Sequence, residues 1–195
     1  MWIKDFNLGL IRRQEFPLDR FAVPMLTPLA VSKKMSALSA SAHSQCVASV
    51  GAGTQFGAAK KAHWISIKLA SLTRSQYAEG LNMAHEDIIK NNRQRESIVL
   101  VTGGSQTTID AISDDEVLQD QYLYYSQLLH SGTPVVVSAG NTSPNSPSLE
   151  LDNTPAIMAD EETLPMIVVS SAEIDGQISS YSKRGEKTTL YAMGV

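Results

Sequence analysis

Two stretches of the sequence place small residues and hydrogen-bonding groups directly after an apolar run. The first is "GTPVVVSAGN" (132–141), in which Gly140 removes side-chain bulk immediately before the amide of Asn141. The second is "SIVLVTGGS" (97–105), which runs into the threonine and two glycines at 102–104. An amide can donate a hydrogen bond, and glycine lets another backbone approach closely. The same residues are also common in ordinary turns, so both interpretations stay open for the motifs alone.

Histidine is the other residue type with suitable chemistry, because imidazole titrates near neutral pH and can take up and release a proton. The sequence contains His43, His63, His85 and His130. The last three fall on a predicted strand, in the middle of a predicted helix and at a helix end, where structural roles explain them. His43 lies in the Ala- and Ser-rich segment 36–53, where packing among small residues on a helix is the structural interpretation.

Composition excludes several classes of protein. The 195 residues, 43% hydrophobic with a net charge of -4, suit one α/β domain or part of a larger one. The 16 basic residues are spread among 20 acidic ones, so no nucleic-acid partner is expected. Cys46 is the single cysteine, which excludes an intrachain disulfide. Charged residues interrupt the N-terminal segment 1–20, and no apolar run could span a membrane, so the sequence predicts no membrane association and, by default, a cytosolic protein.

Apolar runs and helical periods predict the framework around these residues. Periodic apolar positions indicate a surface helix over 71–92, and an acidic first turn followed by Gly132 indicates another over 114–132. Strands that alternate with helices predict an α/β fold with three layers, a mainly parallel sheet and helices on both faces. Ligands bind beyond the carboxyl ends of such strands. The predicted strands are 21–26 (an edge strand because of Pro24), 63–70, 97–105, 132–141 and 165–172, and segment 36–53 suits close helix packing until Gly51 and Gly53 break it.

Five blocks have an order and spacing that resemble a known family. They are "AHSQCVASV" (42–50), "GAAKKAHWISIKL" (57–69), "IVLVTGGS" (98–105), "GTPVVVSAGN" (132–141) and "PMIVVSSAEIDGQISSYSKRGEKTTLYAMGV" (165–195). Together they resemble successive blocks of the subtilases, the subtilisin-like serine peptidases. The first block keeps only His43, Val47 and Ala48 of the family's "HGTHVAG". The resemblance implies a subtilisin-like fold for 36–195, with 1–35 as an N-terminal segment that carries a degenerate first family block.

The resemblance also implies a chemistry, peptide-bond hydrolysis through an acyl-enzyme. His43 would be the general base, taking the proton of the attacking hydroxyl and delivering it to the leaving amine. Asn141 would donate to the oxyanion, an interaction worth about 2.7 to 4 kcal/mol in the transition state. The family segment that matches Thr102, Gly103 and Gly104 pairs with the extended substrate. The expected partner is therefore an extended peptide or protein, without a cofactor, and the sequence shows no oxygen-ligand cluster for the calcium that some subtilases bind.

The catalytic aspartate and the residues around the histidine depart from the family pattern. The best counterpart of the block that carries the aspartate, "FAVPMLTP" (21–28), places Met25 at its position, and Met cannot accept the imidazole N–H. Asp19 lies six residues earlier and is the alternative. The family glycine after the histidine is Ser44 in this chain, and the second family histidine is Cys46.

The family nucleophile has no counterpart in the sequence. Subtilases carry it in a "GTSMAAP"-like segment at the start of a helix, downstream of the block that corresponds to "AMG" (192–194), and no serine of this chain has such surroundings. We therefore predict a truncated or degenerate copy of the peptidase domain, ending before the nucleophile helix. That helix normally fills the centre of the domain, so apolar sheet surface should lie bare. The chain is then expected to aggregate, to form oligomers or to need a complementing chain.

Three alternatives compete with the active peptidase. The first is a catalytically inactive subtilase-like module that binds an extended peptide or a partner protein without cutting it. The second is a nucleotide-binding loop in "GAGTQFGAA" (51–59), although its spacing is G-x-G-x-x-x-G and no clear strand precedes it. The third is a cysteine nucleophile, Cys46, beside His43 on a helix, a pair that lacks a third, orienting group.

Overall fold

The structure, a computed structural model, describes residues 42–55, 57–71, 73–144 and 147–194. The chain divides into two compact units, Met1–Ser66 and Ile67–Val195, each described by itself. The described part of the first unit contains one helix, α1 (Ala42–Ala52). The second unit contains α2 (Arg74–Lys90), β1 (Val99–Val101), α3 (Ile109–Asp114), α4 (Glu116–His130), β2 (Val135–Ser138), the 3-10 helix η3 (Ala156–Met158), β3 (Ile167–Ala172) and β4 (Leu190–Met193).

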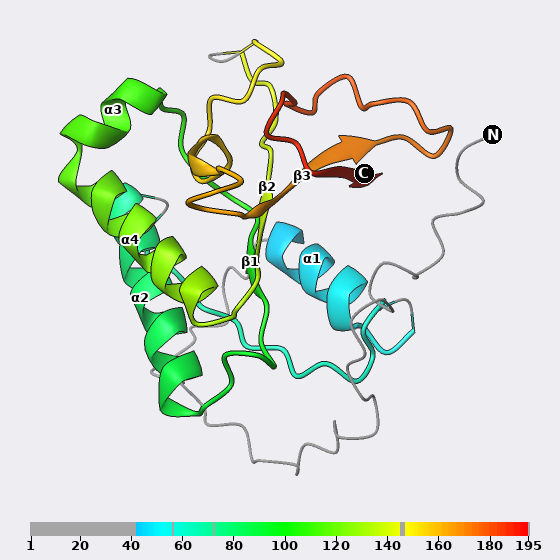
Figure 1. The fold of residues 1–195 in the computed structure, drawn as a ribbon. Helices are drawn as coiled ribbons and strands as arrows, with labels where there is room; N and C mark the ends of the chain where they lie inside the picture. Colours follow the sequence, from blue (N-terminus) through cyan, green and yellow to red (C-terminus); the bar gives the residue numbers. More distant parts are fainter. Residues whose placement is uncertain (1–41, 56, 72, 145–146, 195) are drawn as a thin grey trace. The chain divides into compact units, whose positions relative to one another are not determined.

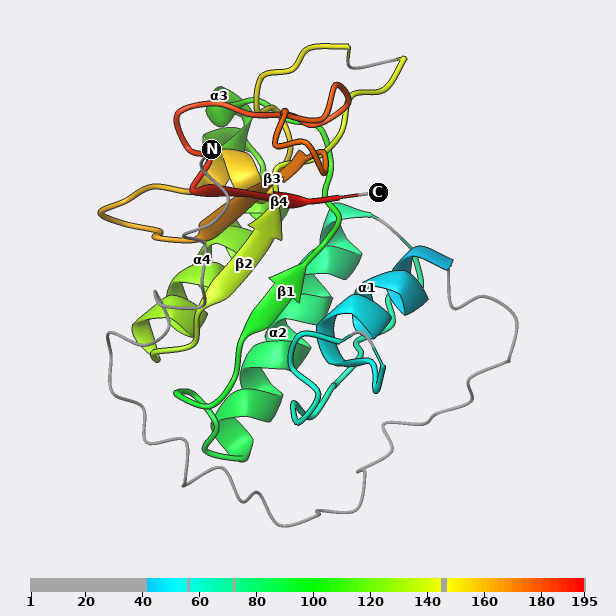
Figure 2. The ribbon, with the colours of Figure 1, turned by 90° about the vertical axis from the view of Figure 1, so that its right-hand side faces the viewer.

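The four strands form one sheet in the order β1-β2-β3-β4, and all three neighbouring pairs are parallel (Figures 1 and 2). Val101 lies opposite Val137, and Val137 lies opposite Val168. Apolar runs without polar alternation are typical of parallel strands, which are buried on both faces in most α/β proteins. The prediction of an α/β fold with a mainly parallel sheet is confirmed.

Local sequence explains where the two long helices begin. The hydroxyl of Thr73 accepts a hydrogen bond from the backbone of Gln76 at the start of α2. The carboxylate of Asp115 accepts from Val117 and Leu118 at the start of α4. Both are good N-cap residues, because a side-chain oxygen satisfies backbone N–H groups that have no partner inside the helix. The two helices predicted over 71–92 and 114–132 are thus confirmed, with ends a few residues inside those limits.

The core lies between the sheet and these helices. Figure 1 shows α2 and α4 side by side on one face of the sheet. The helix residues that point inward recur at helical spacing, and the strand residues that point inward alternate with outward ones. The buried apolar core includes Leu81 and Ile88 of α2, Tyr125 and Leu128 of α4, and Val101, Val135, Val137 and Val168 of the strands.

The opposite face of the sheet carries apolar side chains. The strand register places Leu100, Val136 and Ile167 in one row on that face, with Val169 and Leu190 in another. Leu100 is 46% exposed, and the other side chains of the set are half-buried. Among the described residues of the second unit, no helix lies on this face. The expectation of a bare sheet surface in the whole chain stays a prediction.

Two sequence predictions for the framework need correction. Residues 63–70 do not form a strand, because their alternating pattern finds no hydrogen-bonded neighbour within the described part of the chain. α1 runs through Gly51 to Ala52 instead of breaking at that glycine. The short helix α3 and the strand β4 were not predicted. The strand expected at 21–26 lies outside the described residues.

No helix within the described ranges is long and apolar enough to cross a membrane.

Truncating the core should be far more costly than truncating the outer side of the same helix. Leu128 is completely buried, so Leu128→Ala should lower the free energy of unfolding by about 2–5 kcal/mol. Leu123 of the same helix is 51% exposed, and Leu123→Ala should stay within about 0.5 kcal/mol of the unmodified protein. Urea unfolding followed by circular dichroism measures both. Equal losses for the two variants would contradict the assigned helix orientation.

The apolar face predicts self-association. Exposed apolar patches of this kind mark interfaces or aggregation-prone surfaces. We expect the chain to migrate above its monomer mass of 21.1 kDa in size-exclusion chromatography with light scattering. Leu100→Ser on this face should shift the distribution toward the monomer, whereas Leu123→Ser on α4 should not. A monomer at all concentrations would refute the prediction.

Candidate active site

Two segments that the sequence assigns to a site lie at the same edge of the sheet. Thr102–Gly104 follows β1, and Ala139–Asn141 follows β2. Because the two strands are parallel neighbours with Val101 opposite Val137, their carboxyl ends meet at one edge. Ligands bind at this edge in open parallel sheets. The structure therefore brings these segments together, and their roles in substrate binding and catalysis stay predictions.

The backbone around Asn141 is held by the segment that follows β3. The N–H of Lys183 donates to the carbonyl of Gly140 at 3.0 Å, and the N–H of Thr142 donates to the carbonyl of Tyr181 at 2.8 Å. Asn141 itself is exposed. The backbone is thus fixed on both sides of Asn141, and the exposed side-chain amide contains an N–H group that can donate a hydrogen bond. Its role as the oxyanion donor stays a prediction.

Gly140 is required by its backbone conformation and by its neighbour. Its φ is +88°, a region that residues with a side chain rarely adopt. A Cβ atom at this position would lie 2.6 Å from Nδ2 of Asn153. Glycine therefore allows the strand to turn sharply at its end and brings the loop with Asn153 against it.

The glycines after β1 have an internal packing reason. A Cβ atom at Gly104 would lie 1.5 Å from the carbonyl oxygen of Thr154, and one at Gly103 would lie 2.2 Å from the hydroxyl oxygen of Tyr77. Gly104 is nevertheless exposed. The protein's own backbone thus explains the close approach at Gly104, and pairing with a substrate is not needed to explain the glycine.

Hydrogen bonds join this segment to the loop before η3. The N–H of Thr154 donates to the carbonyl of Ser105 at 2.9 Å. The N–H of Ser105 donates to Oγ1 of Thr154 at 3.3 Å, and the two hydroxyl oxygens lie 3.2 Å apart. The chain after Gly104 is therefore fixed to the neighbouring loop through backbone and side-chain contacts.

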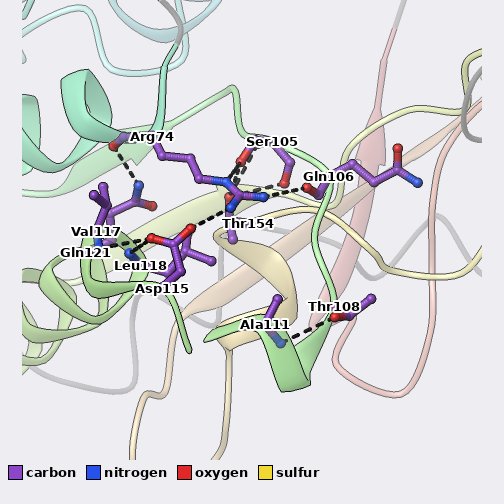
Figure 3. Close-up of polar contacts among 10 residues, drawn as sticks. All are labelled: Arg74, Ser105, Gln106, Thr108, Ala111, Asp115, Val117, Leu118, Gln121 and Thr154. Carbon is purple, nitrogen blue, oxygen red and sulfur yellow. Dashed lines mark hydrogen bonds and ion pairs between the residues drawn. The ribbon is translucent and has the colours of Figure 1, made fainter. Parts of the chain in front are cut away.

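Arg74 links the helices to the same segment (Figure 3). Its Nη1 lies 2.6 Å from Oδ2 of Asp115, its Nε donates to Oγ of Ser105 at 3.3 Å, and its Nη2 donates to the carbonyl of Gln106 at 3.1 Å. The side chain of Gln121 on α4 donates to the carbonyl of Arg74 at 2.8 Å. One guanidinium thus connects the starts of α2 and α4 with the chain that leaves β1.

The sequence analysis did not identify Arg74, although a local signal exists. Arg74 is the first residue of α2, where a positive charge is disfavoured by the helix dipole, and such a residue calls for a specific anionic partner. That partner is Asp115. The hydrogen bond from Arg74, together with those from the backbone of Leu118 and Val117, lowers the pKa of Asp115 below its ordinary value, and desolvation opposes the shift.

The remaining catalytic predictions involve parts of the chain that cannot be placed against this edge. His43 lies in α1 of the first unit, and its predicted position near Asn141 stays a prediction. Met25 and Asp19, the two candidates for the position that orients the histidine, lie outside the described residues.

The alternative sites have simple structural descriptions. Cys46 is exposed on α1, the helix that contains His43. The glycine-rich stretch 51–59 begins in that helix, and Gly53 and Gly57 form successive backbone turns, with Gly57 N–H donating to the carbonyl of Gly53 at 2.9 Å. A nucleotide-binding loop of the G-x-G-x-x-G type follows a strand, so the helix that precedes this stretch disagrees with that interpretation.

The contacts of Asp115 predict a dependence of stability on pH. Asp115→Asn keeps an oxygen that can cap α4 and loses the charge, so it should cost up to about 1 kcal/mol at pH 7, and Asp115→Ala about 1 kcal/mol more. Because the pKa of Asp115 is lowered by folding, its contribution is complete above its ordinary value of about 3.9 and is lost as the pH falls through the folded pKa.

The cost of Asp115→Asn should therefore shrink between pH 7 and about pH 2. Thermal unfolding of the two variants and of the unmodified protein over this range measures it. The control is Asp120→Asn, an exposed position on the same helix that should cost less than about 0.5 kcal/mol at any pH. A cost for Asp115→Asn that stays constant with pH would show that its ionic contacts contribute nothing.

Comparisons with known proteins identify similar sequences and a similar fold. The chain is 29% identical over 160 residues to Subtilisin-like protease 7 of Arthroderma gypseum, a match that covers 78% of this chain and 34% of that protein. A cold-adapted subtilisin-like serine proteinase of known crystal structure superimposes with a TM-score of 0.53 at 20% identity, over 74% of this chain and 46% of that one. The second match supports the fold alone.

The chain thus spans about a third of the length of the curated relative and less than half of the solved structure. The sequence profile of the subtilase family matches residues 30–195, most of the chain. The resemblance that the five sequence blocks predicted is thereby confirmed, and this chain belongs to the subtilase family.

Proposed function

We propose that the chain supplies the substrate-binding edge, the oxyanion donor and the general base of a subtilisin-like serine endopeptidase. The observation that carries the proposal is the position of Asn141 and Thr102–Gly104 after neighbouring parallel strands, within a chain that belongs to the subtilase family. An extended peptide is the proposed ligand, with part of its backbone along Thr102–Gly104. No cofactor takes part.

In the proposed reaction, a serine hydroxyl attacks the carbonyl carbon of the scissile peptide bond. His43 takes the hydroxyl proton as the C–O bond forms, and the carbonyl oxygen becomes an oxyanion that accepts a hydrogen bond from the Asn141 side chain. The C–N bond then breaks, and His43 delivers its proton to the leaving amine. Water hydrolyses the acyl-enzyme by the same steps.

The attacking serine is assigned to none of the described serines, because none of them has the sequence surroundings of the family's nucleophile. Ser170 of β3 is 2% exposed, and Ser179 and Ser182 after it are 0% and 1% exposed, so their hydroxyls are out of reach of a substrate. Ser105 is fixed between Arg74 and Thr154. We propose that the nucleophile comes from a segment outside residues 1–195, in a continuing or a complementing chain.

Asn141 gives the sharpest test. Asn141→Ala should lower kcat by about 10²–10³ with little change in KM, because the donor acts on the oxyanion and not on the bound substrate. Its melting temperature should stay unchanged, since the residue is exposed. His43→Ala should abolish turnover. Hydrolysis of a fluorogenic peptide by this chain, together with the segment that supplies the nucleophile, measures these effects.

Asn82→Ala is the matched control, because Asn82 lies on α2 and donates to Glu86 away from the site. It should retain full activity. A serine-directed phosphonate identifies the nucleophile in the same preparation. Peptide binding without hydrolysis and without labelling would contradict the endopeptidase and support a binding module instead, and an active Asn141→Ala variant would remove the oxyanion assignment.

A further inference from the structure

Lys183 is a lysine without exposed surface. Its side chain is 0% exposed, although it lies in the irregular segment between β3 and β4. Lysine is almost never fully buried unless its charge is paired. In this protein Nζ lies 2.8 Å from Oδ1 of Asp152 and donates to the carbonyl of Ser148 at 2.9 Å. Both partners belong to the loop that connects β2 with η3.

The backbone of the same lysine holds the end of β2. Its N–H donates to the carbonyl of Gly140 at 3.0 Å, directly before the proposed oxyanion donor Asn141. Its carbonyl accepts from the buried hydroxyl of Ser170 on β3 at 2.8 Å. Lys183 therefore connects the turn at Asn141 to β3 through its main chain and to the loop through its side chain.

Asp152 extends this connection to the chain that follows Thr102–Gly104, the other segment of the proposed site. Its Oδ2 accepts from Nε2 of Gln106 at 3.1 Å, and its carbonyl accepts from the N–H of Thr107 at 2.7 Å. Gln106 and Thr107 follow the segment Thr102–Gly104 with one residue between. Figure 3 shows the backbone carbonyl of Gln106 bonded to Arg74 while its side chain points away from that residue.

From these contacts we propose that the ion pair of Lys183 and Asp152 is a positioning element that fixes the segment at Asn141 relative to the segment that begins at Thr102. This inference rests on the proposed function. Neither residue touches the reacting atoms. Lys183 acts through the carbonyl of Gly140, and Asp152 acts through Gln106 and Thr107.

A stabilising role and a positioning role give different results in a double variant. Removing one partner, as in Lys183→Met, leaves the other charge largely buried without its counter-charge and should destabilise the protein strongly. Lys183→Met combined with Asp152→Asn leaves no charge behind, so most of the stability should return. If the pair served stability alone, peptide binding and amide exchange in the double variant would return to their unmodified values together with stability. If the pair positions the two segments, weaker peptide binding and faster amide exchange remain although stability has returned.

Two readouts on the 195-residue chain detect that defect. The first is the Kd for a fluorescein-labelled alanine heptapeptide with a central leucine, which should rise at least tenfold in the double variant. The second is amide hydrogen exchange at positions 107, 142 and 183, whose backbone N–H groups join the segments around the site. Exchange there should accelerate at least tenfold, whereas Ser131 at the end of α4 should exchange as before.

Lys187→Met is the matched control. Lys187 is half-buried and lies, like Lys183, in the segment between β3 and β4. Its Nζ donates to the carbonyls of Ile157 and Ala159, and neither of these contacts involves the segments at Asn141 and Thr102. The substitution should leave the peptide Kd and the exchange of the three site amides unchanged. Asp152→Glu replaces the double variant in this test if the double variant fails to fold, because it keeps the charge and shifts the carboxylate by one methylene. It should also raise the peptide Kd and the exchange rates of the site amides.

The outcomes separate the inference from the proposed function. If the unmodified chain binds no peptide, the proposed binding edge fails, and amide exchange alone decides whether the pair positions the segments. A folded double variant, or Asp152→Glu in its place, that shows unmodified exchange at positions 107, 142 and 183 would overturn the inference. Unmodified peptide affinity in that variant would overturn it as well.

Discussion

The parallel pairing of β1, β2 and β3 is the constraint on which the candidate site depends. Parallel strands end at the same edge, so the residues that follow them become neighbours however far apart they lie in the sequence. At this edge the chain after β1 meets the chain after β2, and the segment after β3 returns to bond with both the turn at Asn141 and the loop before η3. Loss of the register would separate all of them together.

The strand register brings the segments of the candidate site near one another, and polar contacts then fix their positions. Arg74 binds the backbone of Gln106, and Asp152 binds its side chain, so this residue is held from the helices and from the loop at once. A buried ion pair such as that of Asp152 with Lys183 adds little net stability, because desolvation offsets the attraction. The proposed role of the pair in positioning the two segments of the site therefore explains its presence better than a gain in stability does.

Much of the framework could be predicted because its signals are local. The strands that run into "TGG" and "AGN" are apolar throughout, and the two long helices carry their own caps and period. The strand predicted at 63–70 fails because alternation shows a suitable pattern but cannot supply a paired neighbour. The short elements α3 and β4 carry too few residues to show a period.

The supporting charges were harder to predict from sequence. Lys183 sits in "SYSKRG", a polar stretch of the kind that usually lies in solvent, and its partner Asp152 precedes it by a whole strand and two loops. The burial of Lys183 and its pairing with a residue so distant in the sequence depend on the tertiary fold, so no local pattern predicts them. The candidates for orienting the histidine, Met25 and Asp19, lie in a part of the chain that the structure does not describe, so the sequence remains the basis for them.

The exposed thiol of Cys46 has a practical consequence. It is the single cysteine of the sequence, and it lies three residues after His43 on α1, about one helical turn away. A spin label or fluorophore attached there needs no background substitution. Paired with one engineered cysteine in the second unit, it would measure the separation between the helix of the candidate base and the edge of the sheet directly in solution.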